Sequence, residues 1–344
     1  MRTIIAKPTV EAIAQAAEIL RGGGLVAFPT ETVYGLGANA LDAAAVQQIF
    51  EAKGRPSDNP LIVHVASPDA AEPLAVVDER ARRLMAAFWP GPLTLLLPKK
   101  AVVPHETNAG LASVALRMPD HPVALALLTA CALPIAAPSA NRSGRPSPTT
   151  ADHVLKDIGG RIPLILDGGA CAVGLESTVL DLTAPIPTIV RPGGVTREML
   201  LAHLPAVRVA DSVLRPLQAG EKAISPGMMY RHYAPRGTLT LVQGESAKVA
   251  QACTRLYREA EREGKRVCIL AFTENEARYT GLNTRLIGSL ESPETIAHAL
   301  FAALRAMDDE GEEVILCEAI ATDGIGLAIM NRMCRAAAFR VLKV

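Results

Sequence analysis

The stretch LVAFPTETVYGLGANA occupies residues 25–40 of the chain. Its first four residues are an apolar run, which predicts a buried strand over residues 25–28. The rest, residues 29–40, predicts a loop. Asp42 then stands in the position of an N-cap, and residues 43–53 are predicted to form a helix. A strand, a long loop and a helix in direct succession are typical of an α/β fold.

The glycines of this stretch match the spacing GxGxxA of a dinucleotide-binding turn over residues 35–40. In such a turn the first glycine follows the strand directly. Here Pro29 and further residues separate Phe28 from Gly35, so the spacing disfavours a dinucleotide site. The chain also has no GxxxxGK[ST] loop for a triphosphate.

Outward from this stretch, apolar runs alternate with segments of helical periodicity through the first 205 residues. The other helices predicted there span residues 10–21, 78–88, 122–131 and 196–204. The other predicted strands span residues 61–65, 93–97, 113–117, 164–167, 177–182 and 188–190. Because strands outnumber helices in the later part, we expect a mixed rather than a purely parallel sheet.

The pattern weakens after residue 205, which predicts an interdomain linker over residues 206–236. From residue 237 to residue 344, strands and helices alternate again in the order β-α-β-β-α-β-α, which is typical of a Rossmann-like three-layer domain. A chain of 344 residues exceeds what one core usually needs. We therefore expect two domains, residues 1–205 and 237–344, joined by the linker.

The composition narrows the function classes. There are 35 Lys and Arg residues against 35 Asp and Glu residues, so the net charge is zero and a globally basic nucleic-acid binder is excluded. The six cysteines are far apart without a CxxC pair, which favours reduced, buried thiols over a zinc site or disulfides. No secretory signal is visible at the N-terminus, so we expect a cytoplasmic protein.

The segment KGRPSDNPL, residues 53–61, follows a predicted helix and precedes a predicted strand. One interpretation is a helix C-cap at Gly54 with a solvated pair of cations. The other is a phosphate clamp, in which Arg55 offers a planar fork, Lys53 a point charge and Asn59 a neutral donor.

The segment PSANRSGRPS, residues 138–147, follows an apolar run over residues 133–137. A strand would thus deliver three hydroxyls, an amide and two arginines at its carboxyl end, the edge where open α/β sheets bind ligands. A plain turn would use Ser, Asn and Gly but would not need two arginines. This loop is therefore predicted to be functional.

Weaker signals lie elsewhere in the chain. Residues 176–178 (EST) and 191–194 (RPGG) stand at strand ends, and Arg117 ends a predicted strand, where it could pair with a carboxylate or form an ordinary surface ion pair. Residues 230–233 (YRHY) cluster aromatic rings in the predicted linker. They indicate either a hydrophobic anchor or a lid that touches a ligand.

Taken together and in this order, the motifs PTETVYGLG, KGRPSDNPL, SAN, ESTV, RPGG and SPGMMYRHYAP resemble those of the threonylcarbamoyl-AMP synthases in their two-domain form. The resemblance covers essentially the whole chain. It implies a YrdC-like catalytic domain with a twisted mixed sheet, followed by the linker and the Rossmann-like domain. The C-terminal domain contains no motif that indicates a role.

The resemblance also implies a reaction. L-Threonine, bicarbonate and ATP, with Mg²⁺, would give L-threonylcarbamoyladenylate, pyrophosphate and water. The product would pass to the machinery that makes N6-threonylcarbamoyladenosine in tRNA. Such a nucleotidyltransferase needs mostly positioning and neutralisation of phosphate charge.

Residue by residue, the resemblance implies a site with three overlapping sets. The catalytic set is Lys53, Arg55, Ser139 and Asn141. The ATP-binding set is Arg55, Asn59, Ser113, Ser139, Ser147, Arg191 and Tyr233. The threonine-binding set is Thr32, His64, Arg117, Ala137 and Ser177. No protein metal ligand is assigned and no general base is assigned, although His64 is a candidate.

Two alternatives and one hypothesis accompany this interpretation. A concave basic face could make the chain a double-stranded RNA or tRNA-binding module without catalysis. Carbamoyl-transfer maturation enzymes share the catalytic domain, but they carry CxxC zinc fingers that this chain lacks. Residues 225–236 are hypothesised to close over the site as a lid, with Tyr233 touching ATP.

Overall fold

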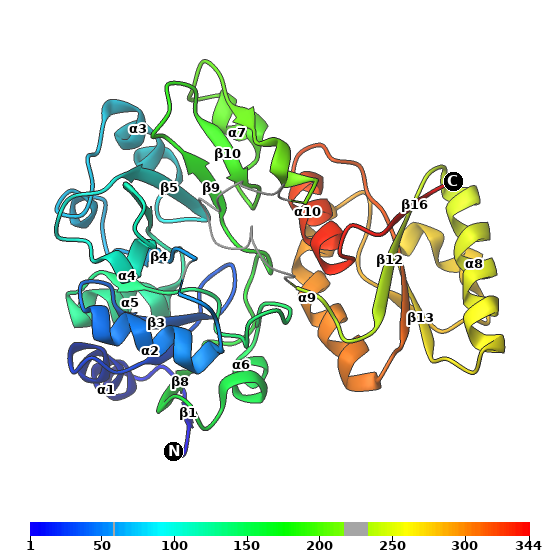
Figure 1. The fold of residues 1–344 in the computed structure, drawn as a ribbon, viewed down its shortest axis with the longest axis horizontal. Coiled ribbons are helices and arrows are strands. Elements are labelled where there is room, and N and C mark those ends of the chain that lie inside the picture. Colours follow the sequence, from blue (N-terminus) through cyan, green and yellow to red (C-terminus); the bar gives the residue numbers. More distant parts are fainter. Residues whose placement is uncertain (58, 217–232) are drawn as a thin grey trace. The chain divides into compact units, whose positions relative to one another are not determined.

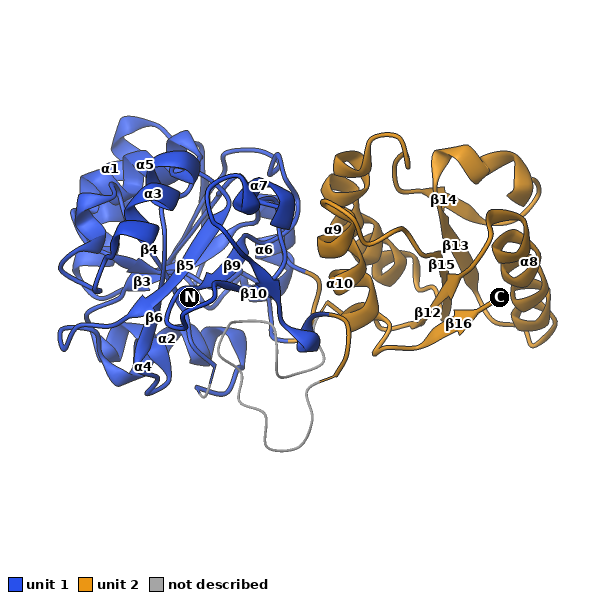
Figure 2. Ribbon diagram, turned by 90° about the horizontal axis from the view of Figure 1, so that it is seen from above, with its two compact units in different colours: residues 1–143, 147–213, 217–229 blue, residues 144–146, 214–216, 230–344 orange. Residues whose placement is uncertain are grey.

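The computed structural model describes residues 1–57, 59–216 and 233–344. These residues form two compact units (Figures 1 and 2). Unit 1 comprises residues 1–143 and 147–213, and unit 2 comprises residues 144–146, 214–216 and 233–344 of the described chain. Each unit has its own sheet.

Unit 1 is built on an 11-stranded sheet in the order β1-β8-β2-β3-β7-β4-β6-β5-β9-β10-β11. The pairs β4–β6 and β5–β9 are parallel, whereas β2–β3, β3–β7 and β5–β6 are antiparallel. The expectation of a mixed sheet is confirmed. The strands are β1 (Ile4–Ala6), β2 (Val26–Phe28), β3 (Gly35–Asn39), β4 (Ile62–His64), β5 (Leu93–Pro98), β6 (Ser113–Arg117), β7 (Ile135–Ala136), β8 (Leu164–Leu166), β9 (Thr178–Asp181), β10 (Thr188–Arg191) and β11 (Arg208–Val209).

Helices cover both faces of this sheet. They are α1 (Val10–Arg21), α2 (Ala43–Lys53), α3 (Glu79–Phe88), α4 (His105–Asn108), α5 (Pro122–Cys131), α6 (Ala151–Ile158) and α7 (Arg197–Leu201). Alternation along β2 divides the core: Val26 and Phe28 pack with α1 and α5, whereas Ala27 packs with α2, α3 and α6. Burial on both faces explains why the strands are continuous apolar runs.

The prediction of a loop over residues 29–40 is wrong in its second half, because residues 35–39 form β3 and pair antiparallel with β2. A Cβ on Gly37 would lie 2.8 Å from the Phe28 ring and 2.9 Å from Ile135. The glycines therefore let the strand pass close to Phe28, and they form no phosphate-binding turn.

Unit 2 contains a five-stranded, wholly parallel sheet in the order β14-β13-β15-β12-β16. Its strands are β12 (Thr238–Gln243), β13 (Val267–Ala271), β14 (Thr284–Leu286), β15 (Val314–Glu318) and β16 (Val341–Lys343). Helix α8 (Ser246–Arg262) lies on one face, and α9 (Pro293–Glu310) and α10 (Gly326–Ala336) lie on the other (Figure 2). The prediction of a Rossmann-like three-layer domain is confirmed.

The boundary between the units differs from the predicted linker in one respect. Strand β11 pairs with β10 and extends the sheet of unit 1, although its residues fall within the predicted linker. Residues 217–232, which hold most of that linker, lie outside the described residues. The predicted domain boundaries stay a prediction.

Two general expectations can also be compared with the structure. All six cysteines are buried and free of disulfides. Within the three described ranges, no helix combines the length and the apolar composition that a membrane span requires.

Candidate functional site

The end of α2 places Lys53 in the interior of unit 1. Gly54 adopts a left-handed conformation (φ 59°) and forms the helix C-cap. Lys53 is only 3% exposed, and its Nζ donates to the carbonyl oxygens of Ser139 and Asn141, the latter at 2.7 Å. The interpretation of a solvated pair of cations is therefore wrong. Lys53 instead ties α2 to the loop that follows β7.

The electrostatics of Lys53 follow from this position. Burial and the neighbouring Arg55 lower the pKa of Lys53 well below its usual value. Arg55 is also buried, donates to the backbone carbonyl of Asn59 at 3.2 Å and stacks over Phe50. Lys53 and Arg55 thus bring two buried cationic side chains close together, and the Asp157 carboxylate partly offsets the charge at Lys53.

The loop after β7 is held by its own polar groups. Ser139 donates to the side-chain oxygen of Asn141 at 2.5 Å, and the Asn141 amide donates to the Arg142 carbonyl at 2.8 Å. Further along, Ser147 is fully buried and donates to the Glu176 carboxylate. Ser139 and Asn141 thus lie next to Lys53, whereas Ser147 is held by Glu176.

Arg117 and His64 are brought together by sheet register. They are the paired residues at the carboxyl ends of the parallel neighbours β6 and β4. Burial, followed by the charge of Arg117, lowers the pKa of His64 to about 3. The imidazole is therefore neutral near pH 7, and it is a poor proton acceptor, which disfavours His64 as the general base.

The guanidinium of Arg117 has three kinds of partner. It donates to the Thr32 hydroxyl at 2.9 Å and to the Gly91 carbonyl at 3.2 Å. Its Nη2 lies 2.6 Å from Oε1 of Glu31 in an ion pair whose side chains are 4% and 8% exposed. The interpretation of Arg117 as an exposed surface pair is wrong, since both partners are buried.

Arg191, at the end of β10, reaches the start of β9. It donates to both the carbonyl and the hydroxyl of Ser177, each at 3.0 Å. The Ser177 hydroxyl also lies 2.7 Å from that of Thr94. Because the charge of Arg191 contributes to the lowered pKa of His64, this set lies close to the threonine set.

Several predicted residues need separate mention. Ala137 is buried, and its backbone N–H donates to Ile62 at 2.9 Å, beside β4. Ser113 begins β6, four residues from Arg117, which places it about 13 Å away along the strand. Tyr233 is buried in unit 2, with its ring 5.1 Å from Phe301 and under the Arg332 guanidinium. Its contact with ATP stays a prediction.

Buried polar atoms without hydrogen-bond partners gather in this part of unit 1. Among the described residues they include both side-chain atoms of Asn59, Nδ1 of His64 and Oε2 of Glu31, whereas Oε1 of Glu31 and Nη2 of Arg117 meet in the ion pair. Native proteins satisfy almost all buried polar groups. The unpartnered side-chain atoms of Asn59 lie beside Arg55, whose guanidinium donates to the Asn59 carbonyl.

Glu31 and Thr94 were not predicted as site residues. Glu31 stands within the motif PTETVYGLG, but its role becomes visible only when the fold brings it to Arg117. Among the described residues, no three His, Cys, Asp or Glu side chains converge as a metal site.

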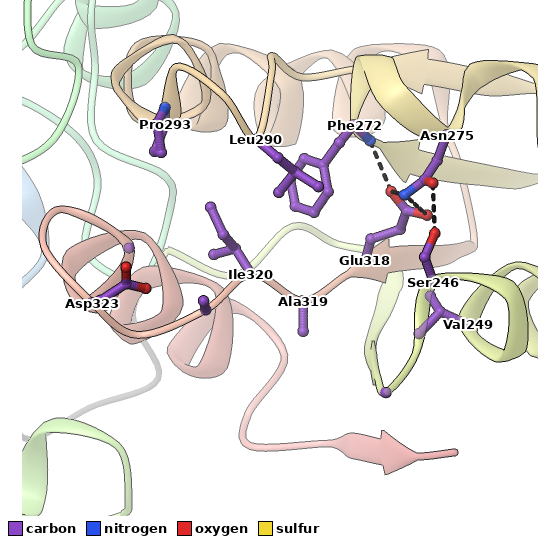
Figure 3. A pocket seen from close by; sticks show the side chains of 13 residues that line it. Ser246, Val249, Phe272, Asn275, Leu290, Pro293, Glu318, Ala319, Ile320 and Asp323 are labelled. Atoms are coloured by element: carbon purple, nitrogen blue, oxygen red, sulfur yellow. Dashed lines mark hydrogen bonds between the residues drawn. The ribbon is translucent and has the colours of Figure 1, made fainter.

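Unit 2 has a cavity of about 380 Å³ at the carboxyl edge of its parallel sheet (Figure 3). Glu318, at the end of β15, accepts hydrogen bonds there from the Phe272 N–H at 2.8 Å, the Asn275 amide at 3.0 Å and the Tyr279 hydroxyl at 2.7 Å. Each carboxylate oxygen is thus satisfied within the protein. This cavity lacks the unsatisfied groups that distinguish the site in unit 1.

The fold is that of an α/β protein with two compact units, and unit 1 contains the buried cationic side chains Lys53 and Arg55. Two family models agree with this class. Residues 18–193 match the Sua5/YciO/YrdC family, described as telomere recombination, and residues 195–338 match the C-terminal domain of threonylcarbamoyl-AMP synthase. The chain belongs to the threonylcarbamoyl-AMP synthase family.

Individual relatives are similar over their full length. The chain is 48% identical to threonylcarbamoyl-AMP synthase of Pyrococcus abyssi, over 96% of this chain and 95% of that one. It is also 48% identical to the Bacillus subtilis protein of the same name, over 96% and 94%. The crystal structure of P. abyssi Sua5 complexed with L-threonine superposes with a TM-score of 0.93 at 46% identity, covering all of both chains. The predicted resemblance is confirmed.

Proposed function

We propose that this chain synthesises L-threonylcarbamoyladenylate from L-threonine, bicarbonate and ATP, releasing pyrophosphate and water. One observation carries the proposal: the buried side-chain amide of Asn59, which has no hydrogen-bond partner, lies beside the buried cation Arg55. A triphosphate and an amino acid supply the complementary groups. The P. abyssi relative solved with L-threonine supports the amino-acid half of the assignment.

The threonine half of the site is assigned to β4, β6 and their neighbours. Arg117 binds the substrate carboxylate, and the hydroxyls of Thr32 and Ser177 and the backbone at Ala137 line the rest of the molecule. His64 is held neutral by burial, so it offers a ring nitrogen as a hydrogen-bonding group without adding a charge. A site of this kind can distinguish threonine from serine and valine by its hydroxyl and methyl groups together.

The ATP half is assigned to the end of α2 and the loop after β7. Arg55, Asn59, Ser139 and Ser147 bind the phosphates, with Arg191 and Ser113 on the nucleotide, and Tyr233 keeps its predicted contact with ATP. The negative triphosphate opposes the effects that lower the pKa of Lys53, so ATP binding favours its ammonium form. Mg²⁺ would enter mainly with the phosphates and water, as it commonly does at triphosphate sites.

The chemistry then needs two bond exchanges. The threonine amine attacks the carbon of bicarbonate, and water leaves to give a carbamate. A carbamate oxygen attacks the α-phosphorus of ATP, and the bond from that phosphorus to the bridging oxygen of pyrophosphate breaks. Lys53, Arg55 and the Ser139–Asn141 pair hold the reacting phosphates and offset their charge.

The product is a labile mixed anhydride, which fits transfer to the tRNA-modifying machinery in the cytoplasm. Closure of residues 225–236 over the site would protect it from water, although residues 225–232 lie outside the described part of the chain.

The experiment is a pyrophosphate-release assay on the full-length protein with ATP, L-threonine and bicarbonate, each omitted in turn. We expect release only when all three are present. Calorimetry should show separate binding of ATP and of threonine. Absence of threonine binding, together with binding of transfer RNA at physiological salt, would favour the RNA-binding alternative instead.

A further inference from the structure

We infer that Glu31 exchanges partners during the reaction. In this structure it neutralises Arg117, and in the substrate complex it binds the α-ammonium group of the amino acid while the substrate carboxylate occupies Arg117. This inference rests on the proposed function. It makes Glu31 a residue that determines specificity for α-amino acids.

The first observation is what already surrounds Arg117. Its Nη1 donates to Thr32 and its Nε to Gly91, at 2.9 and 3.2 Å. Its Nη2 makes no hydrogen bond to a neutral group and lies 2.6 Å from Oε1 of Glu31. Nη2 is thus the guanidinium nitrogen that would donate to a substrate carboxylate. Glu31 occupies the position of that carboxylate.

The second observation concerns the partners of the Glu31 carboxylate. The residue is 6% exposed, and its Oε1 is paired with Arg117, whereas Oε2 has no hydrogen-bond partner among the described residues. The backbone, by contrast, is fixed, because the Glu31 carbonyl accepts from the Val173 N–H at 2.7 Å. The carboxylate can therefore change its partner without breaking a hydrogen bond elsewhere. A buried carboxylate with free lone pairs also favours a partner that has several donors, such as an ammonium group.

The third step follows from the substrate. The carboxylate and the ammonium of an α-amino acid are on the same carbon, so a carboxylate on Arg117 brings the ammonium to the displaced Glu31. Four charges then alternate in sign in a site of low dielectric constant, and each has an opposite neighbour. A ligand with the carboxylate but without the amine would displace Glu31 and leave its charge without a partner.

The test compares L-threonine with (R)-3-hydroxybutyrate, which is threonine without its α-amino group. Calorimetry on the full-length protein measures both ligands with wild type and with Glu31→Gln. We expect the substitution to lower the affinity for threonine at least tenfold. The same substitution should raise the affinity for hydroxybutyrate several-fold. The ligand then no longer has to displace a charged side chain from Arg117.

Opposite signs for the two ligands are the signature of partner exchange. If the affinity for both ligands falls equally, Glu31 only positions Arg117. If the affinity for both ligands rises, Glu31 only competes with the ligands for Arg117. Either result overturns the inference. If wild type binds no threonine at all, the proposed function fails instead, so the two failures are distinguishable.

Two further variants serve as a control and as a replacement for Glu31→Gln. Asp42→Asn removes one carboxylate of unit 1 but keeps the N-cap of α2, because Asn caps as well as Asp, and it should bind both ligands like wild type. If Glu31→Gln does not fold, Glu31→Asp replaces it, with the charge kept but drawn back from the substrate. We expect Glu31→Asp to reduce the preference for threonine over hydroxybutyrate, and an unchanged preference contradicts the inference.

Discussion

Arg117 owes its role to three neighbours that are distant in the sequence. Thr32, Glu31 and Gly91 come from two different loops and meet the guanidinium at the end of β6. The motifs could identify Arg117 and Thr32 as site residues by resemblance. They could not indicate that Glu31 pairs with Arg117, because that contact depends on how the loop after β2 lies against the sheet.

Replacing Arg117 by Ala should weaken threonine binding much more than ATP binding. The physical reason is loss of the charged partner of the substrate carboxylate, and we expect threonine affinity to fall at least tenfold. Calorimetry with each ligand checks this. Equal losses for both ligands would contradict the assignment of Arg117.

The same substitution leaves Glu31 as an unpaired buried charge. Breaking a buried ion pair in this way costs about 3–5 kcal/mol of stability. The double variant Arg117→Met, Glu31→Gln is the control, because it should recover much of the stability without recovering threonine binding.

His64 predicts a dependence of stability on pH. Its pKa falls from 6.5 to about 3 on folding, so below pH 6.5 the unfolded chain binds a proton that the folded chain refuses. The stability from the neutral buried ring is therefore complete above pH 6.5 and is lost as the pH falls toward 3. The loss approaches about 1.4 kcal/mol per pH unit.

Urea unfolding at pH 7, 6, 5 and 4 measures this loss. His64→Gln should show a shallower dependence than wild type over that range. Parallel curves for the two proteins would mean that His64 is not the group that titrates.

At the scale of elements, β3 is a strand that local sequence patterns do not predict. Most helices and strands could be predicted, because their caps and their apolar runs are local features. Residues 35–39 carry two glycines, so propensity favours a loop. Their strand forms because β2 and β7 flank it on both sides, which no local pattern records.

Gly37→Ala should therefore destabilise unit 1. The new Cβ would lie 2.8 Å from Phe28 and 2.9 Å from Ile135, so the ring or the strand has to move. Overpacking of this kind costs about 1–3 kcal/mol, measurable by thermal or urea unfolding.

Gly35→Ala is the matched control on the same strand. Its Cβ would lie 3.2 Å from the Cβ of Ala137, a milder contact, so we expect a smaller loss. The double variant Phe28→Leu, Gly37→Ala should lose less free energy of unfolding than the two single variants lose together. Simple additivity would argue against a clash with the ring.

At the scale of the whole molecule, the chain divides its tasks between two units with separate cores. The unsatisfied polar groups of the proposed site lie in unit 1, whereas the Glu318 network of unit 2 is complete. Length and periodicity were enough to predict two domains. The role of the second domain could not be predicted, because its Rossmann-like pattern defines a fold and not a site.

Deleting residues 214–344 tests whether unit 1 suffices. Because β11 extends its sheet, the fragment 1–213 keeps the complete 11-stranded sheet and should fold, as circular dichroism can check. We expect threonine binding to persist but threonine-dependent pyrophosphate release to fall sharply if residues 225–236 act as the proposed lid. Unchanged release would refute the lid.

The buried cysteines have a practical consequence for work with this protein. Burial raises the pKa of the thiols of Cys171 in unit 1 and of Cys253 and Cys268 in unit 2 to about 12. At neutral pH such thiols are protonated and covered, so alkylating reagents should react only after local opening. Mass spectrometry of pulse-alkylated protein would therefore report, cysteine by cysteine, which unit opens first under stress, without any introduced label.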